Sequence, residues 1–278
     1  YQSCASSLRG MKALGYVRRN AALALPSRHL GLVTVEDNPE AMEALKRASE
    51  EVERGVDMGS VLSIAESAPP MERAARAQGK VEKRGIAAVA KDKAFGFYYQ
   101  QTLDALSQEY ELKEFSPTED QAVEGASLIY LGGGYPELHV EELEGSENTK
   151  RWLRDSVSDG KAVIGECGGM MYLSRYIEHG GKRYDMAGIF QVGIKSMGRL
   201  TIGYTELSVE EDNPIASSGS TIKGHEFHTS YADWVGEEER LVMRNLRGKG
   251  LVGGRDGLLR QRAIGTYSHF MIRSALQP

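Results

Sequence analysis

The sequence predicts an α/β fold, a doubly wound parallel sheet that carries a cysteine on a sharp turn between a strand and a helix. Predominantly apolar segments at 86–90, 127–131 and 162–164 alternate with helical segments. Such segments are typical of strands buried on both faces of a parallel sheet. Two of these strands end in glycine-rich turns. Because ligands of such sheets bind outside the carboxyl ends of strands, we expect the functional residues there.

The first part of the chain predicts mainly helix. Residues 31–35 form a short candidate strand. An asparagine and a proline then supply a helix cap and a first helical residue, and apolar side chains follow at helical spacing. This pattern predicts a helix over 39–54, and a second short helix is expected over 58–66, before a pair of prolines.

From residue 85 the pattern alternates between strands and helices, and residues 183–235 are more β-like. The sequence therefore predicts three parts: 1–30, a helical linker over 31–84, and an α/β domain over 85–278. Within that domain the expected elements are a strand over 86–90, a helix over 97–109, strands over 110–115 and 127–131, a helix around Trp152, and strands over 162–164 and 263–267.

Composition indicates the class of protein. The chain has 278 residues, of which 41% are hydrophobic and 26% charged, and its formal net charge is −5. This balance gives no excess of basic residues of the kind that binds nucleic acid. No apolar run approaches the roughly 18 residues that a membrane span needs. The chain begins at Tyr1 rather than Met, so we expect a fragment or a gene product whose upstream part lies elsewhere.

The two cysteines differ in their surroundings. Cys4 has no strand or glycine turn beside it, and we interpret it as incidental. Two cysteines make no disulfide framework, so we expect a reducing cytoplasm. Cys167 lies between the strand 162–164 and a helix that starts near Met170. A thiol on such an elbow lies near a helix N-terminus, where the dipole and free N–H groups favour the thiolate.

The strand–nucleophile–helix order is that of the serine elbow, with sulfur in place of oxygen. Backbone N–H groups of Gly133, Gly134 and Gly168 could converge on the oxyanion that forms when Cys167 attacks a carbonyl. Each such donor contributes about 3–4 kcal/mol to the transition state. A triple glycine alone is most simply a loop, and the second glycine turn favours the oxyanion interpretation.

A cysteine nucleophile needs a base, and the chain has six histidines. Residue chemistry divides this role between His269, which follows the strand 263–267, and His228. His225, Glu226 and His228 lie in one predicted strand and are candidate accessory residues.

Metal and phosphate motifs are missing from the sequence. The histidines of 225–228 lack the His-Glu-x-x-His spacing of a zinc helix, and no Cys-x-x-Cys occurs. No Gly-x-x-x-x-Gly-Lys-Ser/Thr phosphate loop is present. The sequence therefore predicts neither a metal site nor an ATP site in this chain.

Ordered motifs occur at 24–32, 93–99, 131–137, 166–173, 224–228 and 265–269. Together these segments resemble one family, the cobyrinate a,c-diamide synthases, and in particular their glutamine amidotransferase domain. The resemblance extends over nearly the whole chain and implies a class I glutamine amidotransferase-like, flavodoxin-like fold.

The resemblance implies that Cys167 attacks the side-chain amide of L-glutamine and that His269 activates the thiol and protonates departing ammonia. Ammonia would then attack ATP-activated carboxyls on the a and c acetate side chains of cobyrinate. ATP and Mg²⁺ would bind an N-terminal ATPase domain, of which residues 1–30 resemble only the tail. The usual glutamate two residues after the histidine is Met271 here, as in similar members of this branch.

Other functions remain open at this point. The same motifs would serve a nickel-sirohydrochlorin a,c-diamide synthase, which prepares the cofactor of methanogenesis. A stand-alone Cys-His amide hydrolase or a non-catalytic binding module would also fit the residues. A homodimer is a further expectation.

Overall fold

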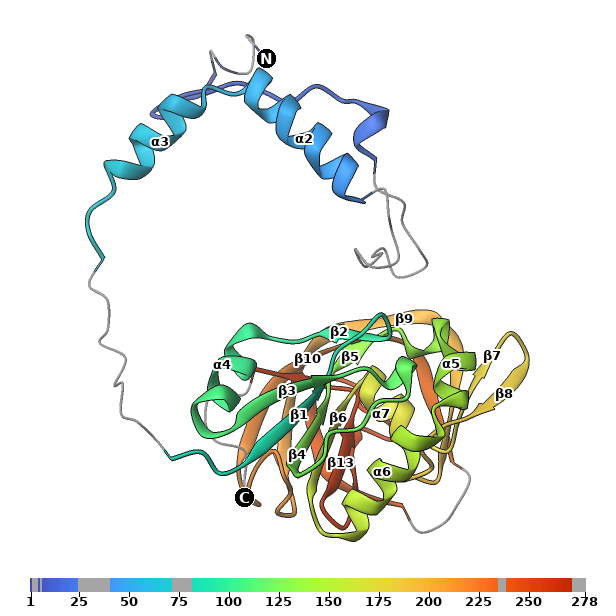
Figure 1. Ribbon diagram of the computed structural model, residues 1–278. Coiled ribbons are helices and arrows are strands. Elements are labelled where there is room, and N and C mark those ends of the chain that lie inside the picture. Colours follow the sequence, from blue (N-terminus) through green and yellow to red (C-terminus); the bar gives the residue numbers. More distant parts are fainter. Residues whose placement is uncertain (2–4, 6, 25–40, 72–81, 235–238, 272–278) are drawn as a thin grey trace. The chain divides into compact units, whose positions relative to one another are not determined.

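In a computed structural model the chain divides into two compact units, Tyr1–Gly79 and Lys80–Pro278 (Figure 1). The strand expected over 31–35 lies outside the described residues. The separation of residues 1–30 from a linker over 31–84 stays a prediction. The structure describes residues 1, 5, 7–24, 41–71, 82–234 and 239–271.

The described part of the first unit contains the short 3₁₀ helix η1 (Ala21–Leu23) and the helices α2 (Ala41–Gly55) and α3 (Met58–Glu66). Both predicted helices are thus confirmed, and α3 has its expected bounds. Asp57 caps α3, because its carboxylate accepts a hydrogen bond from the Ser60 N–H at 3.0 Å.

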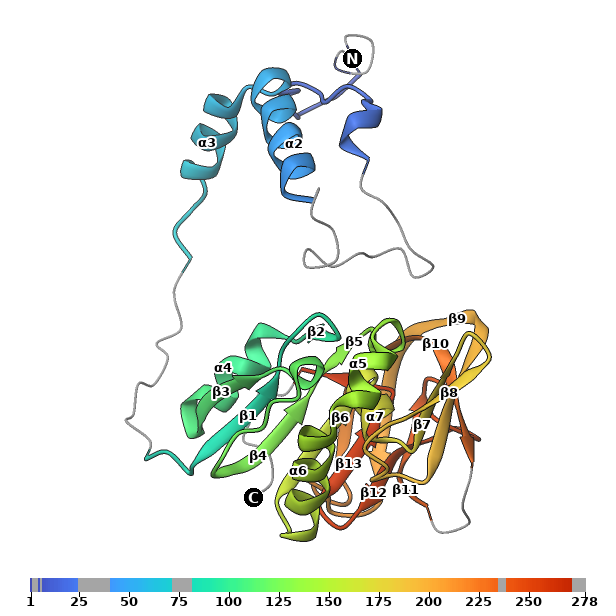
Figure 2. The ribbon, with the colours of Figure 1, turned by 45° about the vertical axis from the view of Figure 1, so that its right-hand side comes forward.

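Five parallel strands form the centre of the second unit (Figure 2). They lie in the order β3-β1-β4-β6-β13, which is 2-1-3-4-5 in chain order and the flavodoxin-like arrangement. The predicted fold class is therefore confirmed. The strands are β1 (Ile86–Ala90), β3 (Glu111–Phe115), β4 (Ala126–Leu131), β6 (Ala162–Glu166) and β13 (Ala263–Thr266).

Both faces of this sheet are buried, as the apolar strand sequences predict. Along β4, Ile129 and Leu131 join one hydrophobic cluster, whereas Leu128 and Tyr130 join the other. Apolar residues of the helices α5 (Val140–Gly145), α6 (Glu147–Ser158) and α7 (Gly168–Leu173) belong to the first cluster. Leu106 of α4 (Gln100–Glu109) belongs to the second.

One predicted helix boundary is wrong. The helix expected over 97–109 begins at Gln100, because Phe95–Phe97 forms a short strand, β2, that pairs with β5 (Gly133–Gly134). Backbone pairing with the glycine turn thus replaces the first helical turn. The 3₁₀ turns η2 (Pro117–Glu119) and η3 (Pro136–Leu138) follow β3 and β5, respectively.

Antiparallel strands extend the sheet beyond β13 and confirm the β-like character of 183–235. The path continues through β12, β11, β9 and β10 to β14, which only two residues separate from β13 in the sequence. The sheet therefore curls back toward its own centre. These strands are β9 (Val192–Val209), β10 (Thr221–Trp234), β11 (Arg240–Arg247), β12 (Arg255–Arg260) and β14 (His269–Phe270). β7 (Tyr176–His179) pairs with β9, and β8 (Lys182–Asp185) pairs with β7.

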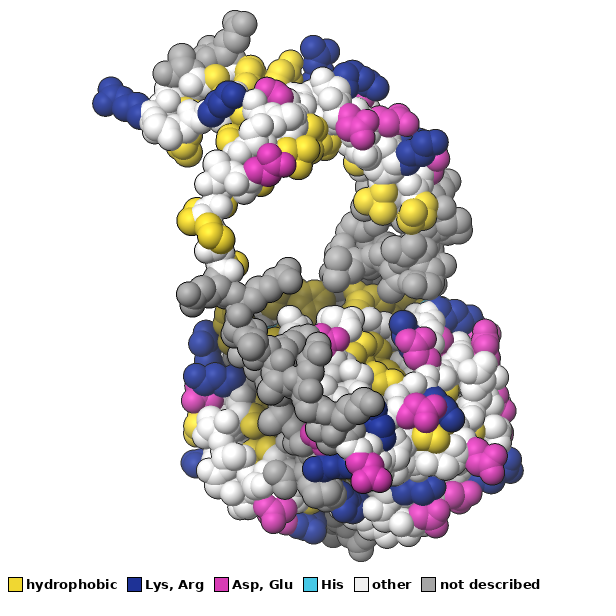
Figure 3. All heavy atoms as spheres, turned by 60° about the vertical axis from the view of Figure 1, so that its left-hand side comes forward, with side chains coloured by type: hydrophobic (Ala, Val, Ile, Leu, Met, Phe, Trp, Pro, Cys, Tyr) yellow, Lys and Arg dark blue, Asp and Glu magenta, His cyan; other side chains and the backbone are white. Residues whose placement is uncertain are grey.

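Acidic and basic side chains are interspersed over the second unit on the side shown in Figure 3. Among the described residues, no helix is long and apolar enough to cross a membrane.

Candidate active site

Cys167 occupies a strained elbow between β6 and α7. Its φ of 46° and ψ of −101° are unusual for a residue with a side chain, and its surface is only 6% exposed. Cys167 N donates a hydrogen bond to Thr266 O at 2.6 Å, which ties the elbow to the end of β13. Strain of this kind is typical of nucleophile elbows and marks a candidate functional residue.

The two glycine turns meet at the elbow, as their place on neighbouring strands predicts. Gly169 N donates to Gly132 O at 2.9 Å, and a side chain at Gly169 would collide with Leu131 O. A Cβ atom on Gly168 would lie 2.9 Å from Gly134 N. Glycine is therefore required at Gly168 and Gly169 for the close approach of the two backbones.

The triple-glycine turn is fixed from its other side. Gly132 N donates to the Tyr98 hydroxyl at 2.9 Å, and that hydroxyl donates to Ala90 O at the end of β1. Tyr135 N donates to Ala94 O at 2.9 Å. These bonds and the β2–β5 pairing hold the turn in one conformation, which is what a preorganised oxyanion site requires.

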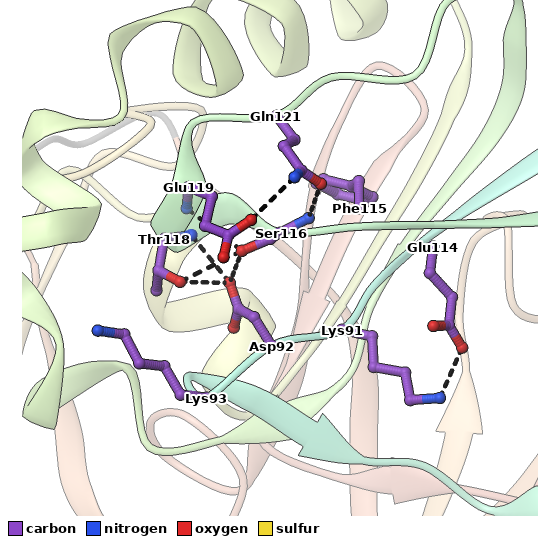
Figure 4. Close-up of a pocket in the computed structure, with 9 residues that line it drawn as sticks. All are labelled: Lys91, Asp92, Lys93, Glu114, Phe115, Ser116, Thr118, Glu119 and Gln121. Carbon is purple, nitrogen blue, oxygen red and sulfur yellow. Dashed lines mark hydrogen bonds and ion pairs between the residues drawn. The ribbon is translucent and has the colours of Figure 1, made fainter. Parts of the chain in front are cut away.

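A pocket of about 530 Å³ opens beside these anchors, at the ends of β1 and β3 (Figure 4). Asp92 lies at its centre and accepts hydrogen bonds from Ser116 Oγ at 3.0 Å and from Thr118 N at 2.8 Å. The other Asp92 oxygen accepts from the backbone of Ala94 and Phe95. Asp92 therefore links the ends of β1 and β3 through hydrogen bonds and fixes the start of β2, the strand that pairs with the glycine turn.

His269 lies against the same turn. A side chain at Gly133 would collide with His269 Cε1, and its Cβ would lie 3.2 Å from Nδ1. The His269 ring stacks on His225, with ring centres 4.9 Å apart, and Tyr99 Oη lies 2.9 Å from His225 Nδ1. Burial, with smaller contributions from His225 and His228, lowers the pKa of His269 to about 3. The ring is therefore neutral near pH 7 and able to act as a base.

His228, the other candidate base, is held by its own neighbours. Its ring stacks on Tyr267 with centres 3.9 Å apart, and its Nδ1 lies 2.8 Å from Ser230 O. Its Nε2 lies 3.9 Å from Glu226 Oε2. Burial opposes ionisation of Glu226, but the nearby His228 ring and the hydrogen bonds from the Lys249 and Gly250 N–H groups outweigh it and lower the pKa of Glu226. Phe227 O, next to His228, lies 3.9 Å from Cys167 Sγ, so this strand borders the thiol.

The expectation that the elbow favours the thiolate is wrong for the resting thiol. Burial raises the pKa of Cys167 to about 12, and the nearby carboxylates of Glu137 and Glu166 act in the same direction. The hydrogen bond from the Gly168 N–H lowers the pKa but does not compensate. Desolvation disfavours the charged form of any acid, so Cys167 needs a base during the reaction.

Sequence reasoning gave no role to two carboxyl groups near the thiol. Loss of solvent around half-buried Glu137 raises its pKa to about 7, and burial raises the pKa of Glu166 to about 8. The signal for Glu166 was its place, a charged residue at the end of an apolar, buried strand. Glu137 follows the triple-glycine turn and gave no comparable signal.

The described residues contain no group of three or more histidine, cysteine, aspartate or glutamate side chains that could hold a metal ion.

Comparison with known proteins decides the family. Residues 86–276 match the model of the CobB/CobQ-like glutamine amidotransferase domain. The chain belongs to this amidotransferase family. Cobyrinate a,c-diamide synthases from Sulfurisphaera tokodaii and Saccharolobus solfataricus are 41% and 42% identical to it, over 99% and 97% of its length.

The fold of the amidotransferase domain is shared more widely. The structure of PurLQS from Thermotoga maritima superposes with a TM-score of 0.51, at 16% identity, over 66% of this chain and 86% of that one. The expected class I glutamine amidotransferase-like fold is thereby confirmed. The chain spans 63% and 62% of the length of the two synthases, so the activity of a whole synthase requires a separate argument.

Proposed function

We propose that this amidotransferase chain is the glutamine-hydrolysing part of a cobyrinate a,c-diamide synthase. The observation that carries the proposal is the strained, buried Cys167 elbow, with one glycine turn in its helix start and a second glycine turn against it. The curated names of the relatives favour cobyrinate over nickel-sirohydrochlorin as the tetrapyrrole.

In the first half of the reaction, Cys167 Sγ attacks the side-chain carbonyl carbon of L-glutamine as His269 takes the thiol proton. The carbonyl oxygen becomes an oxyanion, and we propose that the N–H groups of Gly133, Gly134 and Gly168 stabilise it. The tetrahedral intermediate then collapses, the carbon–nitrogen bond breaks, and His269 returns its proton to the departing ammonia.

In the second half, water attacks the γ-glutamyl thioester on Cys167. His269 takes a proton from that water, and the thiolate leaves and is reprotonated, so that glutamate is released and the thiol restored. His225 stacks on the His269 ring, and this contact supports a role in holding the base rather than in bond breaking. Glu226 and His228 lie near each other, and the His228 ring stacks on Tyr267, so we propose that they support the strand that carries His225.

The ammonia would amidate the a and c acetate side chains of cobyrinate after ATP has activated their carboxyls. No phosphate loop occurs in this chain, and we propose that a preceding domain or a partner chain supplies the ATPase part. We place the protein in the cytoplasm, where reducing conditions keep Cys167 a thiol.

The test combines the chain with the separately expressed ATPase part of the Sulfurisphaera tokodaii relative, ATP, Mg²⁺ and cobyrinate. Formation of the diamide is followed with glutamine and, separately, with ammonium salt as the nitrogen source. The wild-type chain should support both reactions, and Cys167→Ser only the ammonia-dependent one. Loss of both activities in a folded variant, or glutamine turnover by Cys167→Ser, contradicts the assignment. A parallel reaction with nickel-sirohydrochlorin tests the macrocycle.

A further inference from the structure

The sequence places no carboxylate directly after the base of this site. The residue two positions after His269 is Met271, which cannot accept a hydrogen bond from an imidazole N–H of comparable strength. A neutral imidazole has two tautomers, and only the one with hydrogen on Nδ1 leaves Nε2 free to take a proton. Some group must therefore select that tautomer.

The group that faces His269 Nδ1 is the carboxyl of Glu166, whose Oε2 lies 3.7 Å away. The side chains of Glu166 and His269 are 2% and 7% exposed, so bulk water does not compete for this nitrogen. Catalytic hydrogen bonds are often long before substrate binds and tighten in the reacting complex.

The backbone fixes the Glu166 carboxyl in this place. Glu166 pairs with Thr266 in the β6–β13 register, and its Oε1 accepts the Phe270 N–H at 3.4 Å. The nearby Tyr130 hydroxyl acts against burial and lowers the pKa of the carboxyl. The Glu166 side chain thus links the strand end before Cys167 to Phe270, the residue after His269.

We propose that Glu166 is the positioning residue of His269: it accepts the Nδ1–H and leaves Nε2 as the nitrogen that takes the Cys167 proton. This inference rests on the proposed function, because it assumes that His269 is the base. When the thiol proton moves to Nε2, the imidazolium forms opposite a carboxylate that stabilises its charge, as in a Ser-His-Asp triad.

The protonation state of Glu166 then determines the tautomer of His269. Burial raises its pKa to about 8, and the groups that face it are His269, Cys167, Tyr130, Tyr98 and Tyr99. Below that pH the protonated carboxyl donates to Nδ1 and leaves hydrogen on Nε2, which cannot accept the thiol proton. Above it, the carboxylate accepts from Nδ1. The rate of glutamine hydrolysis should therefore rise with pH, and the midpoint of this ascending limb of the pH–rate profile should lie near pH 8.

Steady-state glutamine hydrolysis by the full chain across pH tests this assignment. Glu166→Gln cannot ionise, so it should lose the ascending limb and lower kcat at least tenfold, while KM changes less than threefold. Glu166→Asp keeps an ionisable carboxyl and should retain the limb at a reduced rate. The matched control is Glu111→Gln, the same change at an exposed ion pair with Lys113, and it should behave as wild type.

A second measurement needs neither turnover nor a variant. Nitrogen NMR of labelled histidine in the wild-type chain should show His269 change tautomer, from Nε2–H to Nδ1–H, as pH rises through about 8. An unchanged tautomer across that range, or a Glu166→Gln enzyme with the wild-type limb and rate, overturns the role of Glu166. Wild-type chain that hydrolyses no glutamine contradicts the proposed function instead.

Discussion

Gly133→Ala is the change that most directly tests whether the imidazole of His269 works beside the glycine turn. The added methyl group would collide with His269 Cε1 and would lie 3.2 Å from Nδ1 and 3.3 Å from Phe97 Cβ. The ring has little room to retreat, since it stacks on His225 at 4.9 Å. We therefore expect the imidazole to move by about 1 Å or to rotate.

The magnitude follows from that displacement. A misplacement of about 1 Å in a catalytic group costs about 10²-fold in rate, or about 3 kcal/mol of transition-state stabilisation. Overpacking costs about 1–3 kcal/mol of folding stability, so the variant should remain folded but melt at a lower temperature. The assay is glutamate release at saturating and subsaturating glutamine, with the loss expected mainly in kcat.

Gly96→Ala is the matched control. Gly96 lies in the strand that pairs with the glycine turn, and no atom lies within 4 Å of a Cβ built on it. This variant should keep wild-type activity. If Gly133→Ala has wild-type kcat and pH dependence, His269 does not act at this turn and the reasoning is refuted.

Three further predictions concern the surroundings of the elbow. Because the charge of Glu137 raises the pKa of Cys167, Glu137→Gln should increase thiolate at any given pH and speed iodoacetamide alkylation; an unchanged alkylation profile would exclude this electrostatic effect. Burial raises the pKa of Asp256 from 3.8 to about 6, so its charged form is disfavoured in the native chain. The wild-type chain should then lose about 3 kcal/mol of stability relative to Asp256→Asn as pH rises from about 4 to about 6, and parallel urea titrations that show a constant difference would contradict this. Gly169→Ala should destabilise the domain by at least about 1–3 kcal/mol, since its methyl group meets Leu131 O, and a melting temperature equal to that of wild type would show that the elbow can relax.

Local patterns predicted the framework of the fold well. The apolar strands at 86–90 and 127–131 alternate between two buried faces, a property that residue type alone reveals. The helix boundary near residue 97 could not be predicted, because Phe95–Phe97 becomes a strand only through pairing with Gly133–Gly134, far along the chain.

The elbow itself was also predictable, since glycines after an apolar strand allow a tight reversal. The sequence could not predict the protonation states of the side chains in the folded site. The helix N-terminus at Gly168 suggested an acidic thiol, but tertiary burial and the carboxyls of Glu137 and Glu166 raise the pKa of Cys167. The partner of His269 was equally hidden, because Glu166 reaches it only when β6 and β13 pair.

The most direct test of the central claim is to trap the intermediate on the thiol. The full chain is mixed with glutamine, quenched in acid, digested and examined by mass spectrometry for a γ-glutamyl thioester. The account predicts the adduct on Cys167 in the wild-type chain, and neither adduct nor glutamate release with Cys167→Ala. Glutamine hydrolysis that continues in Cys167→Ala, or an acyl group on another residue, would contradict it.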